Sequence, residues 1–548
     1  MNVSRFSKYI SIMGLASLSL AQSSFAQYPA FEGIRGLSIV EGADGSGSPR
    51  TLIKAVKDPS SFDLIPCNGP TDSKCVDKQA SAAAYLLPCS SENTIGCTIE
   101  VYAISSTGEK LPAKFIRSVG DNPVVDFGET RNLRLPVGAG VGGLWQIPGL
   151  NHGGGTDIYS VQNRIAGWTE RTMRDSTFYF DSVQLQISAV TSVDGPFETP
   201  YAETSSGTVG YGGYSLVDCV MTEQGKCYKR ETLPPGYRFG IKVRLPNALN
   251  GWYHGRLSKP EFVIKSSNAI ASGTYEYQVE ADPVKVPIMT KIIQQDSWSQ
   301  EFYNFVKDQW PMSNGGALLL PGNAGKLPLK LSQLFLPMIG DKATGTGDFW
   351  VIKSLTSWKD GKTDETVDPI TRTCNAGDLN VSGIVTTNAM VYTQGPPVYN
   401  KTEASLDYTV LSPHFDENGL ENVGTYDLLI NSKVARCIYG FSSAPIKAQI
   451  EVVGDDGATK IATTVLGEKG PWLYLSANGF TFSQPTVRVR ITQEKVVAES
   501  KPVTEATKKS LVSAAKPATQ KSITCSNGKT TKKITGASPK CPAGYKKK

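Results

Sequence analysis

The chain of 548 residues is 40% hydrophobic and 9% aromatic, a composition that excludes a disordered polypeptide and predicts a folded protein. With a length prior of roughly 150 residues per domain, the about 520 residues after position 26 correspond to three or four domains. The net charge of +6 is unevenly distributed: residues 27–494 carry −7, whereas residues 495–548 hold 13 lysines and 2 glutamates. Nucleic-acid-binding domains carry a basic face of their own, so no nucleic-acid partner is expected.

The N-terminus is typical of an export signal. Arg5 and Lys8 give a short positive region, Ile10–Ala21 is uncharged, and Ser24–Ala26 fits the small-x-small cleavage pattern. The apolar core of about 12 residues is well short of the roughly 20 that span a bilayer, which favours a cleaved signal over a membrane anchor. We therefore expect a mature chain that starts at Gln27, has no integral membrane segment, and is secreted or held at the cell surface.

Strand signals dominate the rest of the chain. Tyr237–Leu245 alternates apolar and polar residues over nine positions, the pattern of a strand with one buried face. Val183–Ala189 alternates in the same way, but Phe178 and Phe180 stand in the opposite register, which predicts a β-bulge near Ser182. Further strands are expected at 487–491 and from 450 onward, the latter ended by the hairpin signal at 455–457.

Two short helices interrupt this pattern. Trp298–Trp310 places its aromatic residues at helical spacing and is followed by Pro311, and a second helix is expected over Ser332–Leu336 before Pro337. The aromatic face of the first helix suits either a membrane or partner surface or packing against a sheet, and packing is favoured. The predicted fold is mainly β, with several disulfide-stapled β-sandwich-like domains and one or two short helices.

Composition and turn signals divide the chain into seven parts. The largest are expected to be β domains, separated by a mixed region and followed by a linker rich in lysine, alanine and threonine. In order, the parts are a signal peptide (1–26), a β domain with two short disulfides (27–130), a second β domain (131–290), a mixed α/β linker region (291–372), a β-sandwich-like domain (373–494), the linker (495–521) and a basic stapled tail (522–548).

The ten cysteines fall into pairs by spacing. Three pairs are eight residues apart with turn-forming residues between them, a fourth brackets a turn rich in lysine, and the fifth is 63 apart. An even count in an exported chain favours disulfides, and the absence of CxxC or a zinc-finger spacing predicts no metal and no cofactor. The pairs that proximity favours, with other connectivities left open, are Cys67–Cys75, Cys89–Cys97, Cys219–Cys227, Cys374–Cys437 and Cys525–Cys541.

The basic tail is expected to meet polyanionic surfaces such as cell-wall polymers or acidic lipid head groups, or else to act only as a solubilising extension. Two stretches carry a resemblance. Residues 522–529 and 539–548 of the tail resemble a short C-terminal module on exported actinobacterial proteins, and residues 424–428, 434–441 and 477–482 resemble a β domain of uncharacterised exported proteins from the same bacteria. The resemblance implies export and association with the envelope, and it implies no activity.

Catalytic motifs are weak in this sequence. The three histidines, His152, His254 and His414, are far apart, and neither a Gly-x-Ser-x-Gly elbow nor an HExxH motif is present. The glycines of Val137–Gly143 resemble a dinucleotide-binding loop but lack the strand–helix context, so a loop is the better interpretation. The acidic residues before Gly419 are expected to form a turn rather than a calcium site.

The best candidate site is Asn250–Arg256, which we expect to form a turn after the alternating strand. Aromatic rings beside polar donors suit a sugar ring or a cationic ligand, although large aromatic residues more often serve packing. The candidate ligand-binding residues are Trp252, Tyr253, His254 and Arg256. No catalytic residues can be assigned.

These observations predict a secreted cell-surface protein with a non-catalytic binding, adhesion or envelope-structural role, its basic tail contacting an anionic cell-wall polymer or glycan. The alternative is a secreted hydrolase of polysaccharide or peptide with its site in a cleft between β domains. A third hypothesis is a surface or spore-coat protein that assembles into arrays without a ligand.

Overall fold

A computed structural model gives two compact units, residues 1–494 (the body) and residues 495–548 (the tail unit), and each is described by itself. The described residues are 34–40, 51–58, 63–120, 126–194, 219–223, 225–267, 273–288, 290–294, 297–309, 318–321, 326–355, 370, 373–374, 381–393, 395–442, 446–453, 459–461, 465–482, 486–493, 521–528, 530–536, 540–542 and 545–547.

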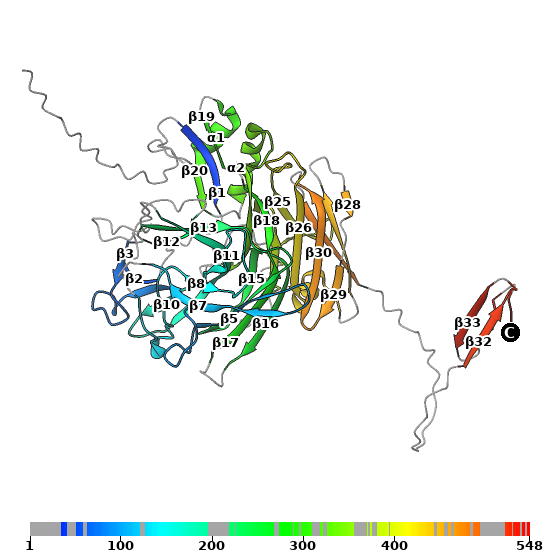
Figure 1. Ribbon diagram of the computed structural model, residues 1–548, viewed down its shortest axis with the longest axis horizontal. Helices are drawn as coiled ribbons and strands as arrows, with labels where there is room; N and C mark the ends of the chain where they lie inside the picture. The colour runs from blue at the N-terminus through cyan, green and yellow to red at the C-terminus, as the bar shows by residue number, and fades with distance from the viewer. Residues whose placement is uncertain are drawn as a thin grey trace, which may run out of the picture. The chain divides into compact units, whose positions relative to one another are not determined.

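One long sheet runs through the body (Figure 1). Neighbouring strands along it are antiparallel except β15 and β22, which are parallel. In spatial order it contains β3 (Asp63–Cys67), β2 (Leu52–Asp58), β4 (Gln79–Tyr85), β10 (Arg164–Thr172), β11 (Phe178–Asp194), β21 (Gly345–Ser354), β15 (Gly251–Arg256), β22 (Val381–Thr387), β26 (Val423–Asn431), β30 (Trp472–Thr481) and β29 (Val465–Lys469).

The 17-residue strand β11 joins several branches of this sheet, because it changes partners along its length. Its first residues pair with β10, its middle with β21 and with one branch strand, and its last residues with another branch strand. The branch strands are β9 (Ile158–Val161), β8 (Gly143–Gln146), β7 (Lys114–Ser118), β13 (Lys226–Glu231), β12 (Cys219–Glu223) and β18 (Val284–Ile288).

A second, five-stranded sheet packs on the first half of the long sheet and encloses the first core. Phe239, Ile241 and Val243 are fully buried in that core, so the alternation of the predicted strand is confirmed. In spatial order the second sheet contains β16 (Ser258–Ser266), β17 (Tyr275–Asp282), β14 (Arg238–Leu245), β5 (Cys97–Ile104) and β6 (Lys110–Pro112).

The second core lies between the other half of the long sheet and a further sheet. Its side chains come from β22, β26 and β30 on one side and from β25, β31 and β27 on the other. The strands of the further sheet are β23 (Val391–Tyr392), β25 (Ser405–Leu411), β31 (Thr486–Gln493), β27 (Ile446–Val453) and β28 (Thr459–Ile461), with β24 (Val398–Asn400) paired to β25. The turn at 455–457 lies outside the described residues.

The fold is therefore mainly β, as predicted, with two sandwich-like halves that share one sheet. The predicted domain boundaries stay predictions. Strand pairing crosses two of them: β4 pairs with β10 across residue 130, and β21 pairs with both β11 and β15 across residue 290.

The helices are short. In α1 (Gln300–Gln309), Phe302 packs edge-on to Trp298 with ring centroids 4.8 Å apart, and it also contacts Phe335 of α2 (Lys326–Phe335) at 5.8 Å. The packing interpretation of Trp298 and Phe302 is thus confirmed, and the second helix begins earlier than the sequence predicts. Further helices whose full span lies within the described residues are η1 (Arg131–Leu133), η3 (Leu336–Ile339) and α4 (Ser432–Tyr439).

A small sheet accompanies α1 and α2. Figure 1 shows β1 (Ile34–Val40), in blue, between two green strands. It is antiparallel to β19 (Thr290–Gln294) and parallel to β20 (Leu318–Pro321). The N-terminal segment of the body thus pairs with strands about 250 residues further along the chain.

Four disulfides are present among the described residues, and they join the pairs that the spacing predicts. The Cys219–Cys227 pairing lies outside what is described, because the side chain of Cys219 does. Several disulfides indicate an oxidising, extracytoplasmic location. Across the part of the chain that the structure describes, no helix is long and apolar enough to cross a membrane. The four bonds are Cys67–Cys75, Cys89–Cys97, Cys374–Cys437 and Cys525–Cys541.

Candidate functional site

The segment that the sequence places in a turn, Asn250–Arg256, instead contains the interior strand β15. Gly251 takes a φ of +77° and ends the preceding turn, and the strand then runs between β21 and β22. Trp252 (7% exposed) packs in the second core, whereas Tyr253 (3% exposed) packs in the first. The predicted turn was wrong, because a strand buried on both faces lacks the alternation that would identify it.

His254 and Arg256 contact the segment that follows β22. The Nδ1 atom of His254 lies 2.8 Å from the hydroxyl oxygen of Tyr392. The fully buried guanidinium of Arg256 lies 5.0 Å from the centroid of the Tyr392 ring and donates to the carbonyl oxygens of Ala389 and Met390. These contacts tie β15 to the start of the second core. A ligand-binding role for Trp252, Tyr253, His254 and Arg256 stays a prediction.

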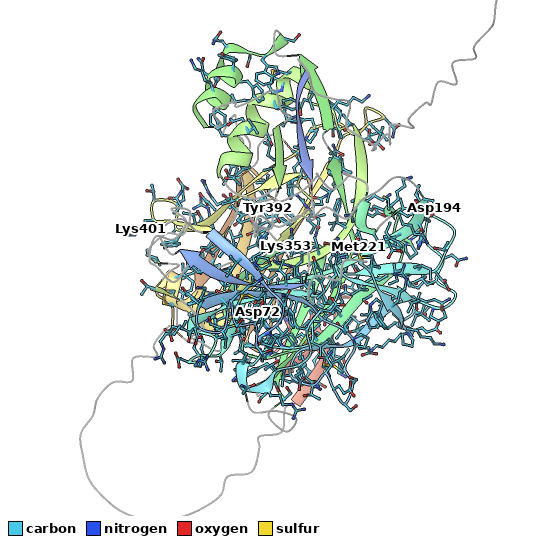
Figure 2. All side chains as sticks on the ribbon, turned by 90° about the vertical axis from the view of Figure 1, so that its left-hand side faces the viewer. Asp72, Asp194, Met221, Lys353, Tyr392 and Lys401 are labelled. Atoms are coloured by element: carbon cyan, nitrogen blue, oxygen red, sulfur yellow. A yellow bond between two sulfur atoms is a disulfide. The ribbon has the colours of Figure 1, made fainter. Side chains whose placement is uncertain are left out.

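Beside His254, strand register brings a row of polar side chains together. Side chains at directly paired positions lie on the same face of a sheet. The neighbours of this row in sequence, such as Ile165 and Val183, face the first core, so the row lies on the opposite face. From β4 to β15, the row is Tyr85, Arg164, Gln184, Lys353 and His254. Figure 2 shows Lys353 near the middle of the view of the body.

We call the face of β2, β4, β10, β11 and β21 that lies opposite the first core the polar face. It carries a second row of paired residues, in which an aromatic pair follows a lysine and a serine. This row is Lys54, Ser81, Trp168 and Tyr179. Between the two rows lies a third with mostly small side chains: Leu52, Ala83, Ala166 and Ser182. On the polar face, a row of mostly small side chains therefore lies between two rows of larger ones.

A β-bulge at Asp181 makes this arrangement possible. Ala166 pairs with Ser182, but the next residue of β10 pairs with Phe180, so Asp181 is the extra residue. Without it, either Phe180 or Val183 would point away from the first core. The bulge near Ser182 that the sequence predicts is confirmed.

Along β11, the polar side chains of this face that lie beyond the first row are joined by a chain of hydrogen bonds. The amide nitrogen of Gln184 donates to Gln186 at 3.0 Å, and that of Gln186 donates to the hydroxyl of Ser188 at 3.2 Å. Arg230 donates to the same hydroxyl at 3.0 Å. These three residues of β11 are buried, whereas Trp168 and others near the second row are partly exposed, so solvent reaches the face from that side.

The other two histidines have local partners. His152 is buried, its Nε2 lies 2.9 Å from the carbonyl oxygen of Ile158, and its Nδ1 accepts from the amide of Gly154. Burial lowers the pKa of His152, which favours the neutral form of the ring. His414 pairs with Asp341 through Nδ1 and through its backbone N–H. Within the described residues, no group of three or more histidine, cysteine or acidic side chains is arranged to hold a metal ion.

The glycine-rich segment Val137–Gly143 packs against the chain before it. The amide of Val119 donates to the carbonyl of Gly142 at 2.9 Å, and the amide of Val141 donates back to Val119 at 2.8 Å. A Cβ on Gly140 would lie 2.1 Å from the carbonyl oxygen of Val119, so these glycines permit close backbone contact. Near Gly419, Asp416 accepts from the amides of Asn418 and Leu420, which is the predicted turn.

The tail unit is a small disulfide-closed sheet. Strand β32 (Lys521–Ser526) pairs with β33 (Thr531–Gly536) and with β34 (Lys546–Lys547), and Cys525 is bonded to Cys541. Residues 521–548 hold eight lysines and no acidic residue. The described lysine side chains in this unit are all exposed, and they are Lys532, Lys533, Lys540, Lys546 and Lys547.

Tyr545 contributes to the local order of this sheet. Its hydroxyl lies 2.8 Å from the hydroxyl of Thr530, and the ammonium of Lys532 lies 5.3 Å from its ring centroid. A lysine-rich segment closed by a disulfide holds its charges at fixed spacing, which lowers the entropy that they would lose on binding a polyanion.

Comparison with known proteins gives no relative for this chain: no family model, no curated protein and no solved structure matches it.

The polar face was not predicted from the sequence. The alternation of Gln184 and Gln186 with apolar residues shows that one face of β11 is polar, but only the strand register reveals its neighbours.

Proposed function

We propose that the protein is an exported, non-catalytic binding protein of the cell surface, and that its basic tail unit attaches it to an anionic polymer of the envelope. The observation that carries this proposal is the tail unit itself: its small sheet is closed by a disulfide, and residues 521–548 hold eight lysines and no acidic residue. The disulfides of the chain, which indicate an extracytoplasmic location, support export.

The distribution of charge supports attachment through the tail rather than through the body. Residues 27–494 carry a net charge of −7 and would be repelled by a polyanion, whereas residues 495–548 carry +11. Attraction of this kind between exposed charges is screened over about 10 Å at 0.1 M salt and about 3 Å at 1 M salt. Binding through the tail is therefore expected to weaken steeply with salt.

A variant of the full chain with fewer positive charges in the tail unit tests the proposal. Lys532, Lys533, Lys546 and Lys547 are changed to glutamine together, and retention on cells is measured through washes of rising salt. We expect this variant to be released at much lower salt than the unaltered protein.

The matched control carries the same four changes at exposed lysines of the body, which are Lys74, Lys229, Lys285 and Lys433. It should be retained like the unaltered protein. Release of both variants at the same salt concentration would show that the tail is not the point of attachment.

A further inference from the structure

The small sheet of the tail unit has two unlike faces, which the strand register assigns. Lys532 of β33 and Lys547 of β34 both pair with Cys525 of β32, so these three side chains lie on one face. Cys525 is fully buried and bonded to Cys541. The ammonium of Lys532 lies 5.3 Å from the ring centroid of Tyr545. Cys541 and Tyr545 therefore pack on this face of the sheet.

The other face carries hydroxyl groups. Alternate residues of a strand point to opposite faces, so the neighbours of Cys525 in sequence face away from it. Thr524 pairs with Lys533 across β32 and β33. Ser526 pairs with Thr531 on one side and with Lys546 on the other. We call this face the hydroxyl face, and its described side chains are Ser522, Thr524, Ser526, Thr531, Lys533 and Lys546.

Most side chains of the hydroxyl face are available to a ligand. Ser522, Thr524 and Thr531 are exposed, and within the described residues their hydroxyl groups form no hydrogen bond. Lys533 and Lys546 are exposed as well. Residues 521–548 contain no acidic side chain, so no carboxylate side chain of this segment competes for the two ammonium groups.

Lysines beside hydroxyl groups are a donor set that suits phosphate. An ammonium group is a compact charge with three donors, and a serine or threonine hydroxyl can donate a further hydrogen bond to a phosphate oxygen. Arginine, whose planar fork matches a carboxylate, is absent from residues 495–548.

The two lysines of the hydroxyl face stand on different strands. Lys533 is on β33 and Lys546 is on β34, so at about 4.8 Å per strand they are separated by roughly 10 Å across the sheet. The hydroxyl groups of β32 lie between them. This arrangement suits a chain with repeated phosphates better than one isolated anion.

We propose that the hydroxyl face binds a polyol-phosphate polymer, with its lysines holding successive phosphate groups and the hydroxyls of Thr524 and Thr531 donating to phosphate oxygens. The inference rests on the proposed function, because it names the class of anionic polymer to which the tail unit attaches. A nucleic acid also carries phosphodiester groups, but the described side chains of the hydroxyl face include no aromatic ring for a base to stack on.

Two double variants of the full chain, matched in charge, test which face binds. Lys533→Gln with Lys546→Gln removes two charges from the hydroxyl face, and Lys532→Gln with Lys547→Gln removes two charges from the opposite face of the same strands. Isothermal titration at low salt uses a polyglycerol-phosphate oligomer. We expect the first variant to lose affinity about tenfold and the second to lose far less. Equal losses would overturn the proposal, because they would show that only the number of charges matters.

A third variant leaves every charge in place. Thr524→Val with Thr531→Val keeps the branched shape of both side chains and removes only their hydroxyl groups, so we expect binding of the same oligomer to weaken about fivefold. Ser526 stays unchanged, because its hydroxyl accepts from a backbone amide at 3.3 Å. Peptide mapping verifies the Cys525–Cys541 bond, and only protein with that bond is compared. Unchanged affinity of the valine variant would overturn the proposal.

Two further probes with the same number of charges identify the polymer. An oligomer of uronic acids should bind more weakly than the polyglycerol phosphate, because carboxylates do not match the donors of the hydroxyl face as well. A single-stranded oligonucleotide should bind no more tightly than the polyglycerol phosphate. Tighter binding of either probe would overturn the assignment to a polyol-phosphate polymer.

The outcomes separate this proposal from the attachment function. If the variant with four lysine changes is released from cells at low salt while the two matched double variants bind the oligomer equally, the hydroxyl face is not the site and attachment through the tail stands. If the variant with four changes is retained like the unaltered protein while the double variants differ as expected, the attachment function is wrong and the binding site stands.

Discussion

Ser354 bridges the backbone on both sides of the β-bulge at Asp181. Its hydroxyl accepts from the amide of Val183 at 2.8 Å and donates to the carbonyl of Asp181 at 3.0 Å. Asn247 bonds to Phe180 through both its amide oxygen and its amide nitrogen. The backbone around Asp181, the extra residue that shifts the in–out alternation of β11, is therefore held by side chains from two other segments. The side chains that β11 presents on each face of the long sheet depend on this bulge.

Ser354→Ala should destabilise the body, because it leaves one amide and one carbonyl of the bulge without this partner. The expected loss in the free energy of unfolding is roughly 1–3 kcal/mol. Urea denaturation measures it, with Ser73→Ala, at an exposed loop position, as the matched control. A loss no larger than that of the control would mean that the bulge is held without Ser354.

Arg256→Met should be among the most damaging single changes in the chain. The guanidinium donates to two buried carbonyl groups that methionine cannot satisfy, at a cost of roughly 1–3 kcal/mol for each. Thermal unfolding should show a large fall in Tm. Arg256→Lys should also be destabilising, because a lysine cannot reproduce the two-pronged contact. Near-normal stability of both variants would contradict a structural role for this arginine.

The Cys374–Cys437 bond should matter far more to the body than Cys525–Cys541 does. It closes a loop of 63 residues and joins α4 to a segment before β22, so its removal is expected to cost about 4 kcal/mol. Serine replaces both cysteines of one bond at a time, and urea denaturation is followed by tryptophan fluorescence. Because residues 495–548 form a separate unit, the tail variant should leave the transition of the body unchanged. Equal shifts for the two variants would contradict this.

Asp427 should give the protein an unusual dependence on pH. Burial raises the pKa of this carboxyl above its ordinary value of 3.8, although it accepts hydrogen bonds from Ser258 and the amide of Lys259. The folded state therefore binds this proton more tightly than the unfolded state. The stability cost of the buried carboxylate is present above the folded pKa and is relieved as pH falls through it towards 3.8.

The stability of the unaltered protein relative to Asp427→Asn should accordingly rise as pH falls from 7 to 4, as measured by urea denaturation at each pH. Asp416 provides a control of opposite sign. The backbone amide of Leu420 is the main cause of its lowered pKa, so the benefit of its carboxylate is present above pH 3.8 and is lost only as pH falls below that value, to which the measurements on Asp416→Asn are extended. If the stability of the unaltered protein relative to Asp427→Asn does not change with pH, or falls as pH falls in the way expected for Asp416→Asn, burial does not dominate the pKa of Asp427.

Local patterns predicted several elements correctly. The alternation of Tyr237–Leu245 predicted β14, and the change of phase between Phe180 and Val183 predicted the bulge, because each depends only on which side chains must face a core. The close cysteine spacings predicted short disulfides for the same reason: the partners lie in one local segment.

The polar face and the true position of β15 depend on distant partners. Arg164 and Lys353 belong to one row only because β10, β11 and β21 pair in a particular register, and no local pattern specifies that pairing. Residues 251–256 lie between two cores, so side chains on both faces of the strand are buried. The sequence there shows a cluster of aromatic residues instead of the alternation that identifies a strand. Local sequence patterns therefore point to residues beside the polar face but not to the face itself.

The most direct test of the central claim is the salt concentration at which the full chain elutes from an immobilised anionic envelope polymer. The account predicts a sharply lower value when Lys532, Lys533, Lys546 and Lys547 are all changed to glutamine. It predicts no change for the matched variant at Lys74, Lys229, Lys285 and Lys433. Elution of the two variants at the same salt concentration would contradict the claim that the tail unit attaches this protein to a polyanion.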